Sequence, residues 1–285
     1  MVKLALFRLL LWMLPRVPRR FGLRLFAALG SVAAVIAPSR RAVRENMRHV
    51  VGPTAGHDLI ERLTRQVFAN QARNYFDMFY FANRPLSDVA AVTDVSALRD
   101  AIRELSGKGA VAVTMHYGNL DVVGQSAGAC ATNALAVVEH LRPEALFRLV
   151  TAIRARTGLE VVPAELAPLA AMRAVRSGRI VVLAADRDIT GTGIVTRFFG
   201  SPARVPDGYA RLAITTRAPI LLLHSHRLPD DRFQLHAALM SAPPQSGDRD
   251  TAVRGIVDAV LEALEPVLAA DPSQWVLFLR LWLGP

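Results

Sequence analysis

His116 and Asp121 have the side-chain types and the spacing that could remove a proton from a hydroxyl group. An imidazole accepts a proton near neutral pH, and a carboxylate bonded to it fixes its tautomer and orientation. The spacing is common, however, and a histidine near a strand end is more often a structural residue. The surrounding sequence therefore decides between a general base and a structural histidine.

The residues around this pair predict a strand that leads into a helix. Residues 110–114 are apolar and partly β-branched, as expected of a buried strand. Residues 120–131 predict a helix, and Asn119 is suited to cap its N-terminus. His116 is therefore expected at the carboxyl end of a strand, where ligands bind in open α/β sheets, with Asp121 folded back towards it.

The rest of the chain alternates strand and helix candidates, which predicts a three-layer α/β fold. We expect a mixed, largely parallel sheet with helices on both faces. Apolar runs predict strands at residues 135–143, 159–163, 179–185, 218–224 and 233–239. Helical patterns occur at residues 41–49, 58–83, 96–105, 144–157, 166–176 and 251–269.

The first 48 residues differ from the rest in charge. They contain ten basic residues and one acidic residue, a net charge of +9 in a chain whose total is +10. Two apolar helix candidates lie here, at residues 3–14 and 19–37, with arginines between Leu, Phe and Trp side chains. This combination is typical of helices that lie on an anionic membrane surface.

We therefore predict a membrane-associating helical segment over residues 1–40 and a catalytic domain over residues 41–285. The segment is expected to hold the protein peripherally on the cytoplasmic face of the plasma membrane, and one tilted transmembrane helix is the alternative. A basic start and an apolar centre also fit an export signal. The second basic and apolar run and the single cysteine argue against export.

Several classes of site are missing from the sequence. The one cysteine, Cys130, forms no intramolecular disulfide and fits a reducing compartment, and its apolar neighbours favour a buried structural side chain. No Cys and His cluster has zinc spacing, and no Walker loop or dinucleotide fingerprint is present. We expect no metal, no nucleic-acid partner and a monomer.

Four blocks in order along the chain resemble the bacterial lipid A late acyltransferase family, within the glycerophospholipid acyltransferase superfamily. The first block holds His116 and Asp121, and the third holds Asp186-Arg187-Asp188. This third block is most similar to the actinobacterial branch, whose known acceptor is a phosphatidylinositol mannoside. The four blocks cover residues 114–124, 138–163, 185–200 and 271–282.

The resemblance implies an acyltransferase that moves a fatty acyl chain from a thioester to a hydroxyl of a membrane glycolipid. The expected thioester is acyl-CoA, as a co-substrate. His116 would be the general base and Asp121 would orient it, so that no enzyme nucleophile and no cofactor are needed. The alternatives are an acyl carrier protein as donor, and lipid A or another lysophospholipid as acceptor. A metal-dependent hydrolase and a non-catalytic membrane scaffold are the two other classes that we weigh.

The same resemblance suggests residues that contact substrate. Arg187 could meet phosphates of coenzyme A or of the acceptor, or could be held by the aspartates beside it. Glu139 and Arg154 could equally form structural ion pairs, and His224 and His226 are expected to be structural. The candidate substrate-binding residues are Tyr117, Asn119, Glu139, Arg154, Asp186, Arg187, Asp188 and Arg204.

Overall fold

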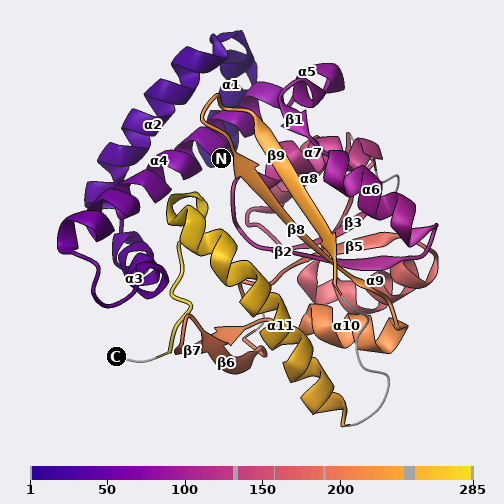
Figure 1. Ribbon diagram of the computed structural model, residues 1–285. Helices are drawn as coiled ribbons and strands as arrows, with labels where there is room; N and C mark the ends of the chain where they lie inside the picture. Colours follow the sequence, from indigo (N-terminus) through magenta and orange to yellow (C-terminus); the bar gives the residue numbers. More distant parts are fainter. Residues whose placement is uncertain (1, 131–133, 157, 189–190, 241–247, 284–285) are drawn as a thin grey trace.

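The computed structural model of the chain describes residues 2–130, 134–156, 158–188, 191–240 and 248–283. Within these ranges a seven-stranded sheet has the order β1-β9-β8-β2-β5-β3-β4 (Figure 1). Neighbouring strands are parallel except β8 and β9, which confirms the predicted largely parallel sheet. The strands are β1 (Thr93–Asp94), β2 (Ala110–Thr114), β3 (Leu135–Val138), β4 (Glu160–Pro163), β5 (Ile180–Ala184), β8 (Ile220–Arg227) and β9 (Phe233–Leu239).

Helices cover both faces of this sheet, as the sequence predicted. Alternate residues of β2 point into different core clusters, Val111 and Val113 into one and Ala110 and Ala112 into the other. The first cluster includes α9 (Ala167–Arg176), α10 (Gly208–Thr216) and α11 (Arg249–Ala270), and the second includes α6 (Ser96–Leu105) and α7 (Leu120–Cys130). A strand buried on both faces must be apolar throughout, which explains why β2 lacks polar alternation.

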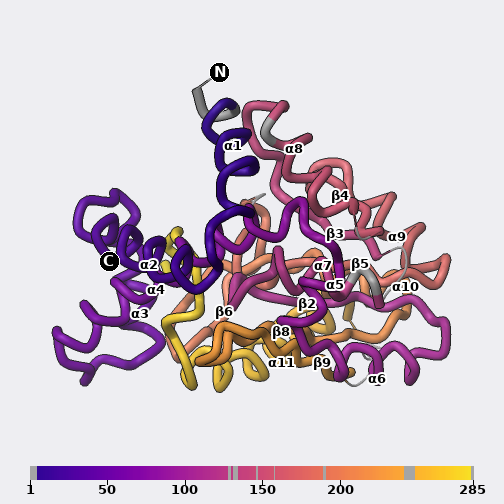
Figure 2. The backbone as a smooth tube through the Cα atoms, turned by 90° about the horizontal axis from the view of Figure 1, so that it is seen from above, coloured from indigo at the N-terminus to yellow at the C-terminus, as the bar shows by residue number. Residues whose placement is uncertain are grey.

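An N-terminal group of helices lies at one side of the molecule (Figure 2). It consists of α1 (Val2–Met13), η1 (Leu14–Arg16), α2 (Arg19–Ile36), α3 (Arg40–Val51) and α4 (His57–Phe81). A Cβ atom on Gly22 of α2 would lie 2.1 Å from the Phe76 ring, and one on Gly30 would lie 2.4 Å from the Phe68 carbonyl oxygen. The two glycines thus allow α2 to pack directly against α4, so the segment shares the protein core.

The outer side of α2 is apolar and exposed. Its large exposed apolar side chains recur at helical spacing and are Phe21, Leu25, Leu29, Val32, Val35 and Ile36. None of the helices in the described ranges is by itself both long and apolar enough to cross a bilayer. Only α2 and α3 taken together meet those two criteria, and they join at a bend of 99°.

The remaining elements connect or edge the sheet. α5 (Leu86–Ala90) precedes β1, α8 (Glu144–Ala155) links β3 to β4, and η2 (Ala164–Leu166) precedes α9. β6 (Ile194–Phe198) and β7 (Ser201–Val205) form a separate antiparallel hairpin. After η3 (Pro272–Gln274) the chain returns to the sheet, where Trp275 forms a bridge with Tyr117.

Candidate active site

His116 lies just beyond the carboxyl end of β2, at the position predicted from the sequence. Its ring Nδ1 is 2.8 Å from Asp186 Oδ1, and its main-chain N–H donates to Asp186 Oδ2 at 2.8 Å. Asp186 lies just beyond the end of β5, which pairs with β2 in parallel. Adjacent parallel strands therefore bring together two residues that are 70 positions apart.

The environment of this pair suits a base and its orienting carboxylate. The Asp186 side chain is 3% exposed, whereas the His116 side chain is 33% exposed. Because Nδ1 faces Asp186, the other ring nitrogen, Nε2, is the one available to a substrate. A neutral imidazole in this arrangement carries its proton on Nδ1 and has its lone pair on Nε2.

The charges of the two groups shift each other's pKa. Burial lowers the pKa of His116, but the adjacent Asp186 carboxylate outweighs burial and raises the pKa above its ordinary value. Asp121 adds to this increase, and Arg187 opposes it. Burial raises the pKa of Asp186, but the charge of His116 and the hydrogen bonds from His116 and Trp275 outweigh burial and lower that pKa.

Asp121 does not make the expected hydrogen bond to His116. Its Oδ1 accepts from Arg154 Nε at 2.9 Å and forms an ion pair with Arg154 Nη2 at 2.8 Å. Asp121 lies in the first turn of α7, and Arg154 lies in the last turn of α8. The carboxylate thus joins two helices next to the site, and Asp186 takes the position beside the imidazole that the sequence suggested for Asp121.

The turn after His116 is fixed by contacts from several segments. Gly118 has a φ of 66°, and a Cβ atom there would lie 2.1 Å from the Ser225 carbonyl oxygen. Ser225 Oγ accepts from the Asn119 N–H at 2.9 Å and donates to the Tyr117 carbonyl at 3.1 Å. Only glycine combines this backbone conformation with such a close approach to β8.

Tyr117 and Asn119, predicted as substrate contacts, have buried side chains. Asn119 Oδ1 accepts from the Val122 N–H at 3.2 Å, which confirms the predicted helix cap. The Tyr117 hydroxyl is 3.2 Å from His226 Nδ1. Both side chains therefore support the turn in this structure and do not line a surface that a substrate could reach.

A second ion pair lies beside the dyad that His116 and Asp186 form. Arg187 Nη2 is 2.5 Å from Glu139 Oε2, so residues that follow β5 and β3 meet at the same edge of the sheet. Asp188 accepts instead from the N–H groups of Gly191 and Gly193, both at 2.9 Å. The exposed Arg204 donates to the Gly193 carbonyl at 3.1 Å, so these two candidates stabilise the loop before β6.

The sequence did not indicate that the C-terminal segment contributes to the dyad. Trp275 is fully buried, and its Nε1–H donates to Asp186 Oδ2 at 2.8 Å. The Gln274 carbonyl accepts from the Gly118 N–H at 3.0 Å. The only sequence signal for this segment was the fourth block of the resemblance, residues 271–282, which did not point to Asp186.

Histidines also gather on the face of the sheet next to Tyr117. The rings of His224 and His236 stack with centroids 4.5 Å apart across β8 and β9, and the His226 ring stacks on Tyr117. Burial, together with the neighbouring histidines, lowers the pKa of His224 to about 4, so that this ring is neutral at physiological pH. The described residues contain no group of three or more His, Cys, Asp or Glu placed to bind a metal ion.

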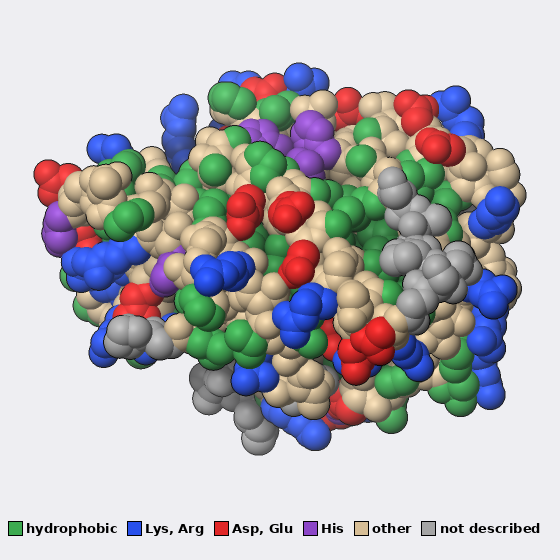
Figure 3. Space-filling model, turned by 60° about the horizontal axis from the view of Figure 1, so that its bottom comes forward, with side chains coloured by type: hydrophobic (Ala, Val, Ile, Leu, Met, Phe, Trp, Pro, Cys, Tyr) green, Lys and Arg blue, Asp and Glu red, His purple; other side chains and the backbone are tan. Residues whose placement is uncertain are grey.

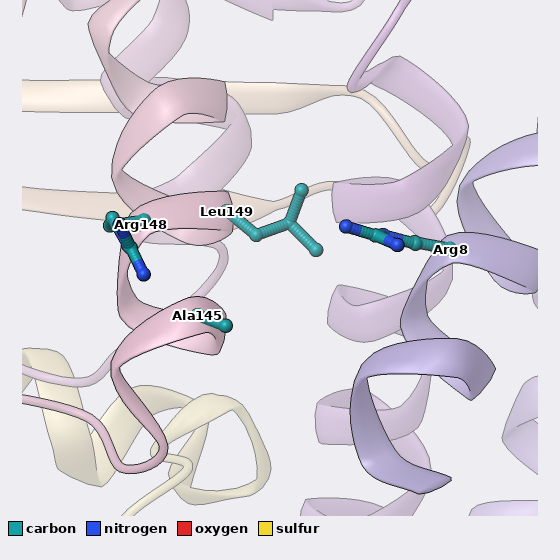
Figure 4. Close-up of a pocket in the computed structure, with 4 residues that line it drawn as sticks. All are labelled: Arg8, Ala145, Arg148 and Leu149. Atoms are coloured by element: carbon teal, nitrogen blue, oxygen red, sulfur yellow. The ribbon is translucent and has the colours of Figure 1, made fainter. Parts of the chain in front are cut away.

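Two further features of the molecule are a group of histidines on its surface and a cleft. In Figure 3, several histidine side chains gather near the top and others lie apart from them towards the left, while acidic and basic side chains are interspersed over that face. Elsewhere, a cleft of about 330 Å³ lies between α1 and α8 (Figure 4). Arg8 lines it from α1, and Ala145, Arg148 and Leu149 line it from α8.

A known protein family matches this chain along nearly its whole length. The family described as bacterial lipid A biosynthesis acyltransferase matches residues 3–284. A protein of Mycobacterium tuberculosis, strain H37Rv, named phosphatidylinositol mannoside acyltransferase, is 35% identical over 190 residues, which are 63% of this chain and 56% of that protein. A protein of the same name from Mycolicibacterium smegmatis is 29% identical over 253 residues, 85% of this chain and 79% of that protein. The chain thus spans little more than half the length of the first of these relatives.

Proposed function

Since the chain belongs to the bacterial lipid A biosynthesis acyltransferase family, we propose that it is an O-acyltransferase. It moves a fatty acyl chain from a thioester donor to a hydroxyl group of a membrane glycolipid. The observation that carries this proposal is the His116–Asp186 pair at the carboxyl end of β2, with the imidazole partly exposed and the carboxylate buried. The names of the relatives favour a phosphatidylinositol mannoside as the acceptor.

In the proposed mechanism, His116 Nε2 removes the proton of the acceptor hydroxyl while the oxygen attacks the thioester carbonyl. The C–O bond forms, the C–S bond breaks, and the imidazolium returns its proton to the leaving thiolate. Asp186 holds the imidazole in the required tautomer and stabilises the imidazolium, as the carboxylate does in a serine-protease triad. The acceptor attacks directly, so no acyl-enzyme forms.

The two ion pairs beside the dyad supply the charges of the site. Arg154 pairs with Asp121, and Arg187 pairs with Glu139. A guanidinium has five N–H donors, so Arg187 could also bind a phosphate of donor or acceptor while it is paired with Glu139. Acyl-CoA is the proposed donor, and an acyl carrier protein thioester is the alternative that the same chemistry allows.

The N-terminal helices are the proposed membrane contact. The exposed apolar side of α2 carries Phe21, Leu25 and Leu29, with exposed arginines at positions 20 and 24. Such a surface would bury apolar side chains at the lipid boundary and keep the guanidinium groups near anionic head groups. We therefore place the protein peripherally on the cytoplasmic leaflet, where a lipid acceptor and a cytosolic thioester are both present.

A transfer assay with the full-length chain tests this function. The purified protein is incubated with palmitoyl-CoA and with vesicles that contain a phosphatidylinositol mannoside, and the acylated product is measured by mass spectrometry. We expect product with the wild-type protein and a loss of about 10²–10⁴ in rate with His116→Gln. His57→Gln, at an exposed histidine on α4, is the matched control and should keep the wild-type rate.

The outcome distinguishes the alternatives. Product with lysophospholipid vesicles alone would replace the acceptor, and product only with an acyl carrier protein thioester would replace the donor. Loss of activity with a chelator would favour the alternative of a metal-dependent hydrolase. No product under any condition, or equal product from His116→Gln, would overturn the proposed function.

A further inference from the structure

The main-chain N–H and the main-chain carbonyl of Gly118 each form a hydrogen bond with a residue that is distant in sequence. The Gly118 N–H donates to the Gln274 carbonyl at 3.0 Å, and the Gly118 carbonyl accepts from Asn74 Nδ2 at 2.6 Å. Asn74 lies on α4, outside the sheet and outside every sequence block that suggested the active site. One helix of the N-terminal group therefore contacts the turn that carries His116.

The amide of Asn74 is oriented by an arginine. Asn74 Oδ1 accepts from Arg227 Nη2 at 3.0 Å. A guanidinium donates hydrogen bonds and accepts none, so the amide oxygen must face Arg227 and the NH₂ group must face Gly118. The side chain is thus committed to donating to the turn.

Arg227 is in turn fixed by a buried carboxylate. Its Nη2 lies 2.7 Å from Asp77 Oδ2, and the Asp77 side chain is fully buried one helical turn after Asn74. The main-chain N–H and carbonyl of Arg227 both bond to the Gln274 side chain, at 2.7 and 3.0 Å. Arg227 therefore connects to Gly118 by two routes, through Asn74 to the carbonyl and through Gln274 to the N–H.

The same carboxylate also reaches the start of α2. Arg19 Nε donates to Asp77 Oδ1 at 2.9 Å, and Arg19 Nη2 donates to the Asp231 carbonyl at 2.8 Å. A buried aspartate with two arginine partners is a costly arrangement to disturb, because removing one partner leaves a charge without compensation. The network thus ties α2, α4 and the turn between β8 and β9 into one unit beside the active site.

We propose that Asn74 is a positioning residue for His116, held by the Arg227–Asp77–Arg19 network. This inference rests on the proposed function. His116 binds Asp186 through both its main-chain N–H and its ring, so a small displacement of the turn disturbs both bonds together. Asn74 acts through the turn and needs no contact with the substrate.

Two substitutions test the proposal. Asn74→Ala removes the donor to Gly118. Asn74→Asp also removes it but keeps an oxygen for Arg227, which preserves folding if the alanine variant unfolds. We expect both to lower kcat between about tenfold and about 100-fold, with an unchanged KM for acyl-CoA. The matched control is Thr64→Val, earlier on α4, which removes a buried hydrogen bond to the Ile60 carbonyl within that helix and leaves the contacts of the turn intact.

The pH dependence separates positioning from a loss of stability. The charged groups that act on His116 are Asp186 after β5, Arg187 beside it and Asp121 on α7. A displaced turn weakens the contact with Asp186, so the raised pKa of His116 should fall in Asn74→Ala, which adds no charge beside the turn. The acidic limb of the pH–rate profile should then move to lower pH, whereas Thr64→Val should leave it in place.

Two outcomes would overturn the inference. One is an unchanged limb and kcat in both Asn74 variants, and the other is an equal displacement in Thr64→Val. The NMR titration of the His116 ring in the wild-type and Asn74→Ala proteins gives the same comparison without turnover. If the wild-type protein transfers no acyl group, the proposed function fails, and this titration still decides whether Asn74 positions the ring.

Discussion

At the scale of single residues, the position of His116 in the fold could be predicted and its hydrogen-bonding partner could not. An apolar strand followed by a histidine and a helix cap is a local pattern, and the structure places His116 and Asn119 accordingly. Asp186 follows another strand, and the sequence does not state which strands are neighbours in the sheet. Proximity in sequence favoured Asp121, which pairs with Arg154 instead.

The pairing with Asp186 predicts a particular pH dependence. Asp186 raises the pKa of His116 above 6.5, and only the neutral ring can accept a proton. The rate should therefore increase as pH rises through this elevated pKa. In Asp186→Asn the limb should move to lower pH because the carboxylate charge is gone. Profiles of kcat/KM against pH for the two proteins provide the comparison, and coincident limbs would contradict the assignment.

At the scale of elements, strands and helices with strong apolar periodicity were predicted close to their observed bounds. β2 and α6 agree with the sequence, and α2, α4 and α11 differ by one or two residues at their ends. The β6–β7 hairpin and α10 were not predicted. The hairpin turn uses Phe199 at a φ of 47° before Gly200, and a phenylalanine in that conformation gives no recognisable turn signal. The hydrogen bond from Trp275 in the C-terminal segment to Asp186 was not predicted either.

The turn between β2 and α7 offers a test at this scale. Gly118→Ala would place a methyl group 2.1 Å from the Ser225 carbonyl oxygen, in addition to the positive φ. Gly52→Ala is the matched control, because Gly52 has a φ of 86° and no atom within 4 Å of the added methyl group. The unfavourable φ should cost each variant about 1–3 kcal/mol. Only Gly118→Ala should lose more stability than this, and with it the acyl-transfer activity. Denaturant unfolding measures the difference, and equal losses would show that the turn can move away from β8.

At the scale of the whole molecule, the concentration of basic charge at the N-terminus was evident from composition. The structure adds that α2 packs closely on α4 through Gly22 and Gly30 and leaves an apolar side exposed. The predicted division of the chain at residue 40 stays a prediction. α2 shares buried contacts with Phe76 and Phe79 of α4. Removing the segment would uncover these side chains, so surface substitutions are the better test of membrane binding.

Membrane association should depend on the exposed side of α2. Phe21→Glu combined with Leu29→Glu should weaken partitioning onto vesicles of anionic phospholipid by more than about tenfold, because each apolar side chain contributes roughly 1.5–3 kcal/mol when fully buried. Val195→Glu, at an exposed apolar residue on β6, should leave partitioning unchanged. Sedimentation with vesicles measures all three proteins. Equal binding by the double variant and the wild-type protein would show that α2 is not the contact.

The most direct test of the proposed pair of His116 and Asp186 compares substitutions of two carboxylates. The measurement is the rate of acyl transfer from palmitoyl-CoA to vesicle-bound glycolipid under single turnover. Asp186→Asn removes the charge that orients His116 and should lower the rate by about 10²–10⁴. Asp121→Asn weakens the pair with Arg154 and keeps the dyad, so its rate should fall less. A rate for Asp186→Asn equal to or above that for Asp121→Asn would contradict the claim that Asp186 is the partner of the catalytic base.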